Sequence, residues 1–285
     1  MKVLVTGANG QVGRALQATA PADAVVTPTD MAELDICDAD AVAAFVAHAR
    51  PDIIFNAAAY TAVDKAEGDE AAAQRLNADA VAHLAAAARQ CGALLAHIST
   101  DFVFDGAQGS PYAPGAAPNP LSAYGRTKLA GERAAGADAL ILRTAWVYSV
   151  DGGNFVKTML RLMAEREELR VVADQIGTPT LATGIATTLW ALAGQRRTGM
   201  FHHTDSGAAS WYDFAVAIHE EALAIGLLRR PVRIVPIATE DYPTPARRPA
   251  YSVLDKRATI AAIGSPAPHW RDNLRIMLKE LKANG

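Results

Sequence analysis

Short apolar runs alternate with longer amphipathic stretches through the first half of the chain. The runs occupy residues 1–6, 24–27, 52–59, 94–98 and 139–144, and each is followed by a stretch with helical periodicity, the longest at 70–90. Strands that alternate with helices at this spacing predict an α/β fold, a doubly wound parallel sheet of the Rossmann type. The run at 52–59 is continuously apolar, as expected of a strand buried on both faces of such a sheet.

The alternation loosens after Gly152. We expect helices near 154–168, 182–193, 211–223 and 270–281, and strands at 169–172 and 200–203. The sequence therefore predicts a dinucleotide-binding domain over 1–150, to which 180–205 return. Residues 151–179 and 206–285 are expected to form a smaller substrate-binding lobe beside a cleft above the sheet.

The first predicted strand runs into a G-x-x-G-x-x-G motif formed by Gly7, Gly10 and Gly13. Between a strand and a helix, such glycines permit a tight turn, a close approach of the backbone to a pyrophosphate and close helix–strand packing. Free N–H groups at the helix N-terminus then face the phosphates. The alternative is a glycine-rich turn that binds nothing.

Asp30 follows the second predicted strand, about 20 residues beyond the glycines, where an acid binds the ribose 2′-hydroxyl of a dinucleotide. A carboxylate at this position repels a 2′-phosphate, so Asp30 favours NADH over NADPH. The alternative is that Asp30 is only a turn residue.

A second candidate for chemistry is the pair Tyr124 and Lys128. Pro118 and Pro120 precede it, so a helix can begin only at about Ser122, which is a competent N-cap. The two side chains then lie one turn apart, about 6 Å between Cβ atoms. A tyrosine has a pKa of about 10, and a neighbouring cation can lower the pKa of an acid by roughly 1–3, towards the range useful for proton transfer. Alone, the spacing also fits a solvated lysine beside a half-buried tyrosine.

Composition excludes several classes of function. The net charge is −3 and no basic cluster is dense enough to follow a nucleic acid backbone. No uncharged apolar run reaches about 18 residues, no cleavable signal pattern opens the chain, and Cys37 and Cys91 fit neither a disulfide framework nor a zinc motif. We expect a soluble, reduced, cytoplasmic protein without a structural metal.

Two further positions are ambiguous from the residues alone. Arg247 and Arg248 lie between prolines and suit a diphosphate, because guanidinium groups bind phosphate with two hydrogen bonds, but they could equally be solvated surface residues. Trp146 could be a core residue or a platform for a sugar ring.

Longer motifs give the chain a family resemblance. They comprise the glycine motif, 56–67 (NAAAYTAVDKAE), 99–104 (STDFVF), 124–132 (YGRTKLAGE), 143–148 (RTAWVY), 154–155, 157–159, 174–175, 179–180, 242–246 (YPTPA) and 248–249. With these motifs the chain resembles the extended short-chain dehydrogenase/reductases, and within that superfamily the dTDP-4-dehydrorhamnose reductases. The glycine motif and Tyr-x-x-x-Lys indicate only the superfamily, whereas residues 62–67 and 242–246 are much more specific.

The resemblance implies hydride transfer from NADH or NADPH to the C4 ketone of dTDP-4-dehydro-L-rhamnose, the last step of dTDP-rhamnose synthesis. Tyr124 would supply the proton, Lys128 would hold the nicotinamide ribose, and Thr100 would orient the reacting oxygen. The implied cofactor site comprises Gly7, Gly10, Gln11, Val12, Gly13, Asp30, Asp35, Ile36, Ala59, Tyr60, Thr61, Ile98, Tyr124 and Lys128. The implied substrate contacts are Thr100, Asp101, Trp146 and Arg248, since Arg248 takes the family's Arg-Pro position and Arg247 does not.

Two features depart from the resemblance or leave it open. Family members that dimerise through magnesium hold the ion with glutamates, but this chain has Ala15 and Thr183 at the corresponding places, and alanine offers no oxygen ligand. We therefore expect no metal site and a monomer or weak homodimer. Family members often accept both NADH and NADPH, so Asp30 alone does not decide the cofactor.

Two rival functions fit the same motifs. One is another sugar-nucleotide reductase or a 4-epimerase of the superfamily. The other is a non-catalytic subunit resembling the regulatory subunit of methionine adenosyltransferase, against which the intact Thr100, Tyr124 and Lys128 argue.

Overall fold

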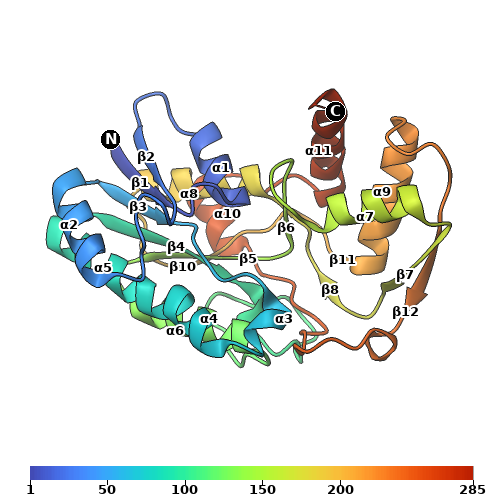
Figure 1. The fold of residues 1–285 in the computed structure, drawn as a ribbon, viewed down its shortest axis with the longest axis horizontal. Helices are drawn as coiled ribbons and strands as arrows, with labels where there is room; N and C mark the ends of the chain where they lie inside the picture. The colour runs from blue at the N-terminus through green and yellow to red at the C-terminus, as the bar shows by residue number, and fades with distance from the viewer. Residues whose placement is uncertain (285) are drawn as a thin grey trace.

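A computed structural model of the protein describes residues 1–284. Its centre is a six-stranded sheet, parallel throughout, in the order β2-β1-β3-β4-β5-β10 (Figure 1). The strands are β1 (Lys2–Thr6), β2 (Val25–Thr29), β3 (Ile53–Asn56), β4 (Leu94–Thr100), β5 (Leu140–Thr144) and β10 (Gly199–His202). The predicted doubly wound parallel sheet is confirmed.

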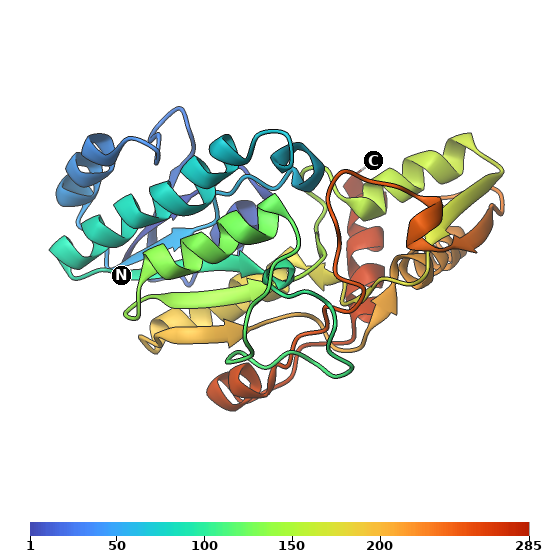
Figure 2. The same ribbon diagram turned by 90° about the horizontal axis from the view of Figure 1, so that it is seen from below.

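Helices cover both faces of this sheet because its strands are apolar on both sides. Leu4, Ile54 and Leu95 pack towards α2 (Ala39–Ala49) and α5 (Ala80–Cys91), while Val3, Val5 and Phe55 pack towards α1 (Gln11–Ala18) and α8 (Ala182–Gly194). The helix α6 (Ala123–Ala135) lies beside α5 across the first of these faces (Figure 2).

The strand order reverses between β1 and β3. From β1 the chain crosses outward to β2, and from β3 it proceeds the other way to β4, β5 and β10. In open parallel sheets, ligands bind at the carboxyl ends of the strands at such a point. The turns after Thr6 and Asn56 therefore define the expected ligand edge.

Beyond the sheet lies a distal region formed by α7 (Phe155–Glu165), β7 (Glu168–Val172), α9 (Trp211–Ala224), β12 (Arg233–Ile237) and α11 (Trp270–Asn284), at the right of Figure 1. Its three helices enclose an apolar cluster of their own around Phe214, Met163 and Leu274. β7 pairs in parallel with β12. Short strand pairs lie between the two regions: β6 (Val147–Tyr148) with β9 (Thr180–Leu181), and β8 (Ile176–Gly177) with β11 (Ala209–Ser210).

The segment that follows β9 packs against the sheet. β10 pairs with β5, with Met200 opposite Ile141, and α8 packs on α1. One later segment also joins the sheet, because α10 (Arg257–Ile263) packs on α8 and β10. Part of the segment 206–285 thus lies with the sheet and not with the distal region.

The helix predicted over 70–90 is interrupted. It consists of α4 (Glu70–Gln74), a π-helical turn at η1 (Arg75–Asp79) and α5. α6 approaches this turn so closely that a Cβ at Gly131 would lie 2.0 Å from the carbonyl oxygen of Asn77. The remaining short helices are α3 (Val63–Ala66), η2 (Asp101–Val103) and η3 (Thr239–Asp241).

In the part of the chain that the structure describes, none of the helices combines the length and the hydropathy that crossing a membrane requires.

Candidate active site

The glycine turn after β1 is shaped by the close approach of backbone segments. Gly7 has a φ of 66°, and a Cβ there would lie 2.6 Å from the backbone nitrogen of Ala58 at the end of β3. A Cβ at Gly13 would lie 2.1 Å from the carbonyl oxygen of Gly7. Only glycine fits at these two positions, and the backbone is thereby held in a tight turn at the start of α1, whose first N–H groups lack helical partners. The turn fits the predicted dinucleotide.

Asp30 lies directly beside this turn. Its carboxylate accepts hydrogen bonds from the backbone N–H of Asn9 (3.1 Å) and of Met31 (2.9 Å). Arg14, which the sequence analysis did not select, donates its Nε–H to the carbonyl of the same Asn9 (3.1 Å). An acidic and a basic side chain therefore both contact Asn9 in this turn.

The segment after β3 carries Ala59, Tyr60 and Thr61, and it is fixed by Asn77 in the π-helical turn. The Asn77 amide accepts from the Tyr60 N–H (2.8 Å), donates to the Tyr60 carbonyl (3.2 Å) and donates to Thr127 on α6 (3.1 Å). Asn77 therefore couples the predicted cofactor segment to the helix that carries Tyr124. The signal available in the sequence was an asparagine within the alanine-rich stretch at 70–90.

Other predicted cofactor residues occupy two separate places. Asp35 accepts from the Cys37 N–H (2.9 Å) and Ile36 is buried, both in the loop between β2 and α2. Gln11 opens α1, and its Oε1 accepts from Ser149 and Asn154 (3.1 Å each). Val12 packs against the core on the α8 side.

Tyr124 occupies the first turn of α6, which begins where the prolines predicted. Ser122 caps the helix by accepting from the Gly125 N–H (3.1 Å), and the Tyr124 ring packs edge-on against Phe102 at 5.5 Å between centroids. Burial raises the pKa of Tyr124 to about 12, the hydroxyl of Thr100 opposes the rise, and the carboxylate of Asp101 adds to it. The expected lowering of the Tyr124 pKa by Lys128 is wrong for this structure, because desolvation dominates and the charge that acts on the phenol, that of Asp101, raises the pKa further.

Lys128 is directed towards β4. Its Nζ donates to the carbonyl of Ile98 (2.6 Å) and lies 3.5 Å from Nε2 of His97. Burial lowers the pKa of Lys128 to about 8, and Glu132 opposes the shift.

Asp101 and Thr100 end β4 next to the phenol. Asp101 is 2% exposed, its Oδ1 accepts from the Thr100 hydroxyl (3.0 Å), and its Oδ2 has no hydrogen-bond partner among residues 1–284. Burial raises the pKa of Asp101 to about 6, while hydroxyl groups of Ser252 and Thr100 oppose this rise. The structure thus brings together Thr100, Asp101 and Tyr124.

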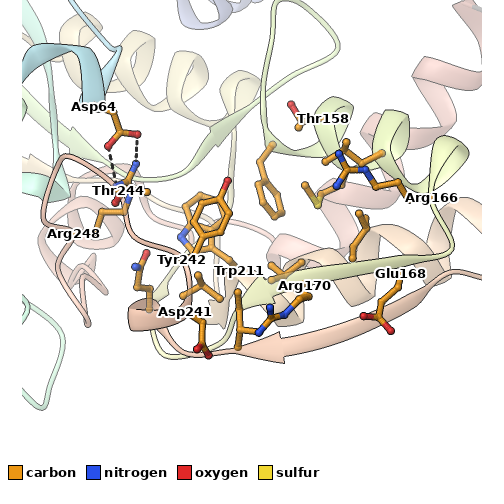
Figure 3. A pocket seen from close by; sticks show the side chains of 18 residues that line it. Asp64, Thr158, Arg166, Glu168, Arg170, Trp211, Asp241, Tyr242, Thr244 and Arg248 are labelled. Atoms are coloured by element: carbon orange, nitrogen blue, oxygen red, sulfur yellow. Dashed lines mark hydrogen bonds and ion pairs between the residues drawn. The ribbon is translucent and has the colours of Figure 1, made fainter.

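A cavity of about 700 Å³ opens beside this edge, between α3 and the distal region (Figure 3). Arg248 lines it and forms two hydrogen bonds with Asp64 of α3 (2.7 and 3.1 Å), which hold the pKa of that carboxyl below its usual value. Arg247 is exposed and does not line the cavity.

Aromatic and basic side chains share the cavity wall. Sequence reasoning missed these lining residues, since they come from segments distant in sequence: Phe155, Arg166, Arg170, Trp211 and Tyr242. Trp146 stacks on Trp211 at 3.5 Å between ring centroids and has a φ of 47°. The predicted sugar platform is therefore one half of a tryptophan pair whose other half lines the cavity.

No cluster of three or more His, Cys, Asp or Glu side chains suited to a metal ion occurs within residues 1–284. Ala15 is buried and Thr183 is exposed. The expectation of a protein without a metal site stays a prediction.

Comparison with known proteins gives the family. A family model described as RmlD substrate binding domain matches residues 1–283. A dTDP-4-dehydrorhamnose reductase of Burkholderia thailandensis is 46% identical over 99% of both chains. Among solved structures, the reductase of Clostridium acetobutylicum is 41% identical with a TM-score of 0.94 over 99% of this chain and 100% of that one. The reductase of Bacillus anthracis, in complex with NADP, is 37% identical with a TM-score of 0.92 over 98% and 99%. Since these matches run almost from end to end, the chain belongs to the dTDP-4-dehydrorhamnose reductase family.

Proposed function

We propose that this chain reduces the C4 ketone of dTDP-4-dehydro-L-rhamnose to dTDP-L-rhamnose with NADH or NADPH, the last step of dTDP-rhamnose synthesis. The observation that carries the proposal is the grouping of Tyr124 and Thr100 at the carboxyl edge of a sheet whose glycine turn fits a dinucleotide. Membership of this reductase family supports the choice of substrate.

Tyr124 is the proton donor in this mechanism. The bound dinucleotide supplies the hydride, and the oxygen at C4 then needs a proton. A phenol whose pKa is raised to about 12 keeps its proton at neutral pH and can give it to a more basic nascent alkoxide. Thr100 orients the phenol and the reacting oxygen, since its hydroxyl already acts on Tyr124.

The cofactor is held by groups at the carboxyl ends of β1 and β3, where the strand order reverses. Gly7, Gly10, Gln11, Val12 and Gly13 bind the pyrophosphate, and the other residues assigned by the family resemblance line the remainder, with Lys128 on the nicotinamide ribose. Asp30 suits the ribose hydroxyls of NADH, and Arg14 offers a guanidinium to the 2′-phosphate of NADPH. The presence of both side chains supports use of both cofactors.

The cavity receives the nucleotide end of the substrate. Arg248 and the exposed Arg166 and Arg170 supply positive charge for the diphosphate, and Trp211 and Tyr242 supply aromatic faces for the base. The sugar then lies near Trp146 and Asp101. We assign residues 1–150 and 180–205 to the cofactor domain and 151–179 and 206–285 to the substrate lobe, with α10 attached to the former; Gly285 lies outside the described residues.

The test is incubation of the protein with dTDP-4-dehydrorhamnose and either NADH or NADPH while the absorbance of the reduced cofactor is followed. Stoichiometric loss of absorbance with formation of dTDP-L-rhamnose is the expected result. Tightly bound NAD that co-purifies, with no net consumption of NADH, would instead indicate an epimerase. An inactive chain that alters the kinetics of a partner enzyme would indicate a regulatory subunit.

A further inference from the structure

A row of buried polar side chains crosses the sheet beneath the active site and ends at Lys128. The Thr6 hydroxyl on β1 donates to Asn56 Oδ1 on β3 (2.8 Å), Asn56 Nδ2 lies 3.1 Å from His97 Nδ1 on β4, and His97 Nε2 lies 3.5 Å from Lys128 Nζ on α6. All four side chains are 2% exposed or less. Lys128 has a role in the mechanism proposed above, but His97 has none.

The orientation of the Asn56 amide is fixed by the backbone. The N–H of Ala58 points at Asn56 Oδ1 (3.2 Å), and a backbone N–H can only donate. The atom facing Ala58 and Thr6 must therefore be the oxygen. The amide –NH2 group then faces His97 and donates to Nδ1.

This donation determines where the proton of His97 lies. Because Nδ1 accepts a hydrogen bond, the neutral ring carries its proton on Nε2. Protonation of both nitrogens is disfavoured, since burial and the proximity of Lys128 hold the pKa of His97 well below its usual value. The Nε2–H therefore points at Lys128 Nζ.

We propose that His97 is a positioning residue that presents an N–H group to Lys128 and thereby favours the uncharged amine form of Lys128. An ammonium group cannot accept this hydrogen bond, whereas an amine can accept it from His97 and still donate to the carbonyl of Ile98. The hydrogen bond from His97 also keeps the Lys128 Nζ atom next to β4. Lys128 thus becomes a group that gains or loses a proton at mildly alkaline pH.

Other ionisable groups surround Lys128, and among them Glu132 raises its pKa. Glu132, one turn further along α6, forms a buried ion pair with Arg143 on β5. Asp101 follows β4 and Tyr124 precedes Lys128 on α6. On the other elements packed against α6, the ionisable side chains are exposed, except for the partly buried Asp64, His83 and Cys91; the exposed ones are Lys65, Glu67, Glu70, Arg75, Asp79 and Arg89.

The first test is a direct measurement of the tautomer. In protein labelled with ¹⁵N-histidine and free of cofactor, long-range ¹H–¹⁵N correlation spectra report which ring nitrogen carries the proton. The His97 signals are assigned by their loss in His97→Gln or in His97→Leu. We expect the Nε2–H form from pH 6 to 9; a proton on Nδ1, or a doubly protonated ring, would overturn the proposal.

The second test uses the pH dependence of kcat/KM and therefore rests on the proposed function. Activity that needs the ammonium form of Lys128 falls as pH rises through the Lys128 pKa. In His97→Gln the opposing N–H is gone and an amide oxygen can accept from Lys128, so this alkaline limb should move up by about one pH unit. The matched control is His48→Gln, an exposed residue of α2, whose profile should equal that of the wild type.

The two tests separate the possible failures. An alkaline limb that stays in place in a folded, active His97→Gln variant contradicts the proposal. A wild-type protein without turnover contradicts the proposed function instead, and the tautomer measurement then decides the role of His97 alone.

Discussion

At the scale of single residues, burial shifts the pKa values of the active-site groups more than charges on residues nearby in sequence do. Lys128 is one helical turn from Tyr124, yet the pKa of Tyr124 rises to about 12 and that of Lys128 falls to about 8, both chiefly through burial. A phenol that holds its proton is a poor base but a suitable acid for a basic alkoxide. The environment of Tyr124 therefore suits the reduction of a ketone, in which the phenol donates a proton.

The Tyr124→Phe substitution tests this role. The variant lacks the proton donor but keeps the aromatic ring that packs against Phe102, so kcat should fall by about 10²–10⁴. The dissociation constant for NADPH, measured by fluorescence, should change by less than about twofold. Tyr112→Phe serves as the control, since its hydroxyl bonds to Asp105 and Gln108 on the surface loop and its activity should be retained. Turnover near the wild-type rate in Tyr124→Phe would exclude the phenol as donor.

Asp101 predicts a measurable dependence of stability on pH. Its pKa is about 6 in the folded protein and near 3.8 when unfolded, so between these values the folded state binds more protons. The contribution of Asp101 to stability is therefore lost as pH rises from about 4 to about 6, and above pH 6 its carboxylate destabilises the fold. Asp101→Asn should accordingly increase the free energy of unfolding by about 1–3 kcal/mol at pH 7.5 and by much less at pH 4. Denaturant titrations of both proteins at the two pH values measure the difference; an equal effect at both would refute the assignment.

At the scale of elements, local sequence patterns predict most of the helices and strands that the structure shows. The strands of the sheet and the cap at Ser122 were predicted because each depends on local periodicity or on one capping residue. The π-helical turn at Arg75–Asp79 was not predicted; it lies where Gly131 of α6, far away in sequence, approaches Asn77. Local patterns define an element but not the distortion imposed by its neighbour.

A buried ion pair joins α6 to the sheet. Arg143 on β5 forms two hydrogen bonds with Glu132 on α6 (2.6 and 2.7 Å), Ser99 donates to the same carboxylate, and both charged side chains are at most 5% exposed. Glu132→Gln leaves the Arg143 charge uncompensated and should lower the free energy of unfolding by about 3–5 kcal/mol.

The matched control for this pair is Glu70→Gln, which breaks the exposed pair with Arg126 on the same helix. Its cost should be at most about 1 kcal/mol, because both side chains are nearly half exposed. Similar losses of stability in the two variants, measured by urea denaturation, would show that burial does not set the strength of the Glu132 pair.

At the scale of the whole molecule, the substrate site depends on contacts that no local pattern encodes. The resemblance identified Arg248 as the better candidate of two adjacent arginines, and the structure locates Arg248 alone of the two on the cavity wall. Trp211, Arg166 and Arg170 carry no motif of their own. They become neighbours only because α7, β7 and α9 pack together in the distal region.

The ion pair of Arg248 with Asp64 joins the distal side of the cavity to α3 beside the sheet (Figure 3). Its side chains are 23% and 39% exposed, so the pair itself contributes little to stability. If Arg248 binds the diphosphate, Arg248→Ala should raise KM for the nucleotide sugar about tenfold or more, with KM for NADPH and the melting temperature nearly unchanged. Asp64→Asn leaves the Arg248 guanidinium present but removes its ion-pair partner. This variant should raise the same KM by a smaller factor. Arg247→Ala is the matched control and should behave as the wild type, since Arg247 lies outside the cavity; equal KM values for Arg248→Ala and Arg247→Ala would remove Arg248 from the substrate site.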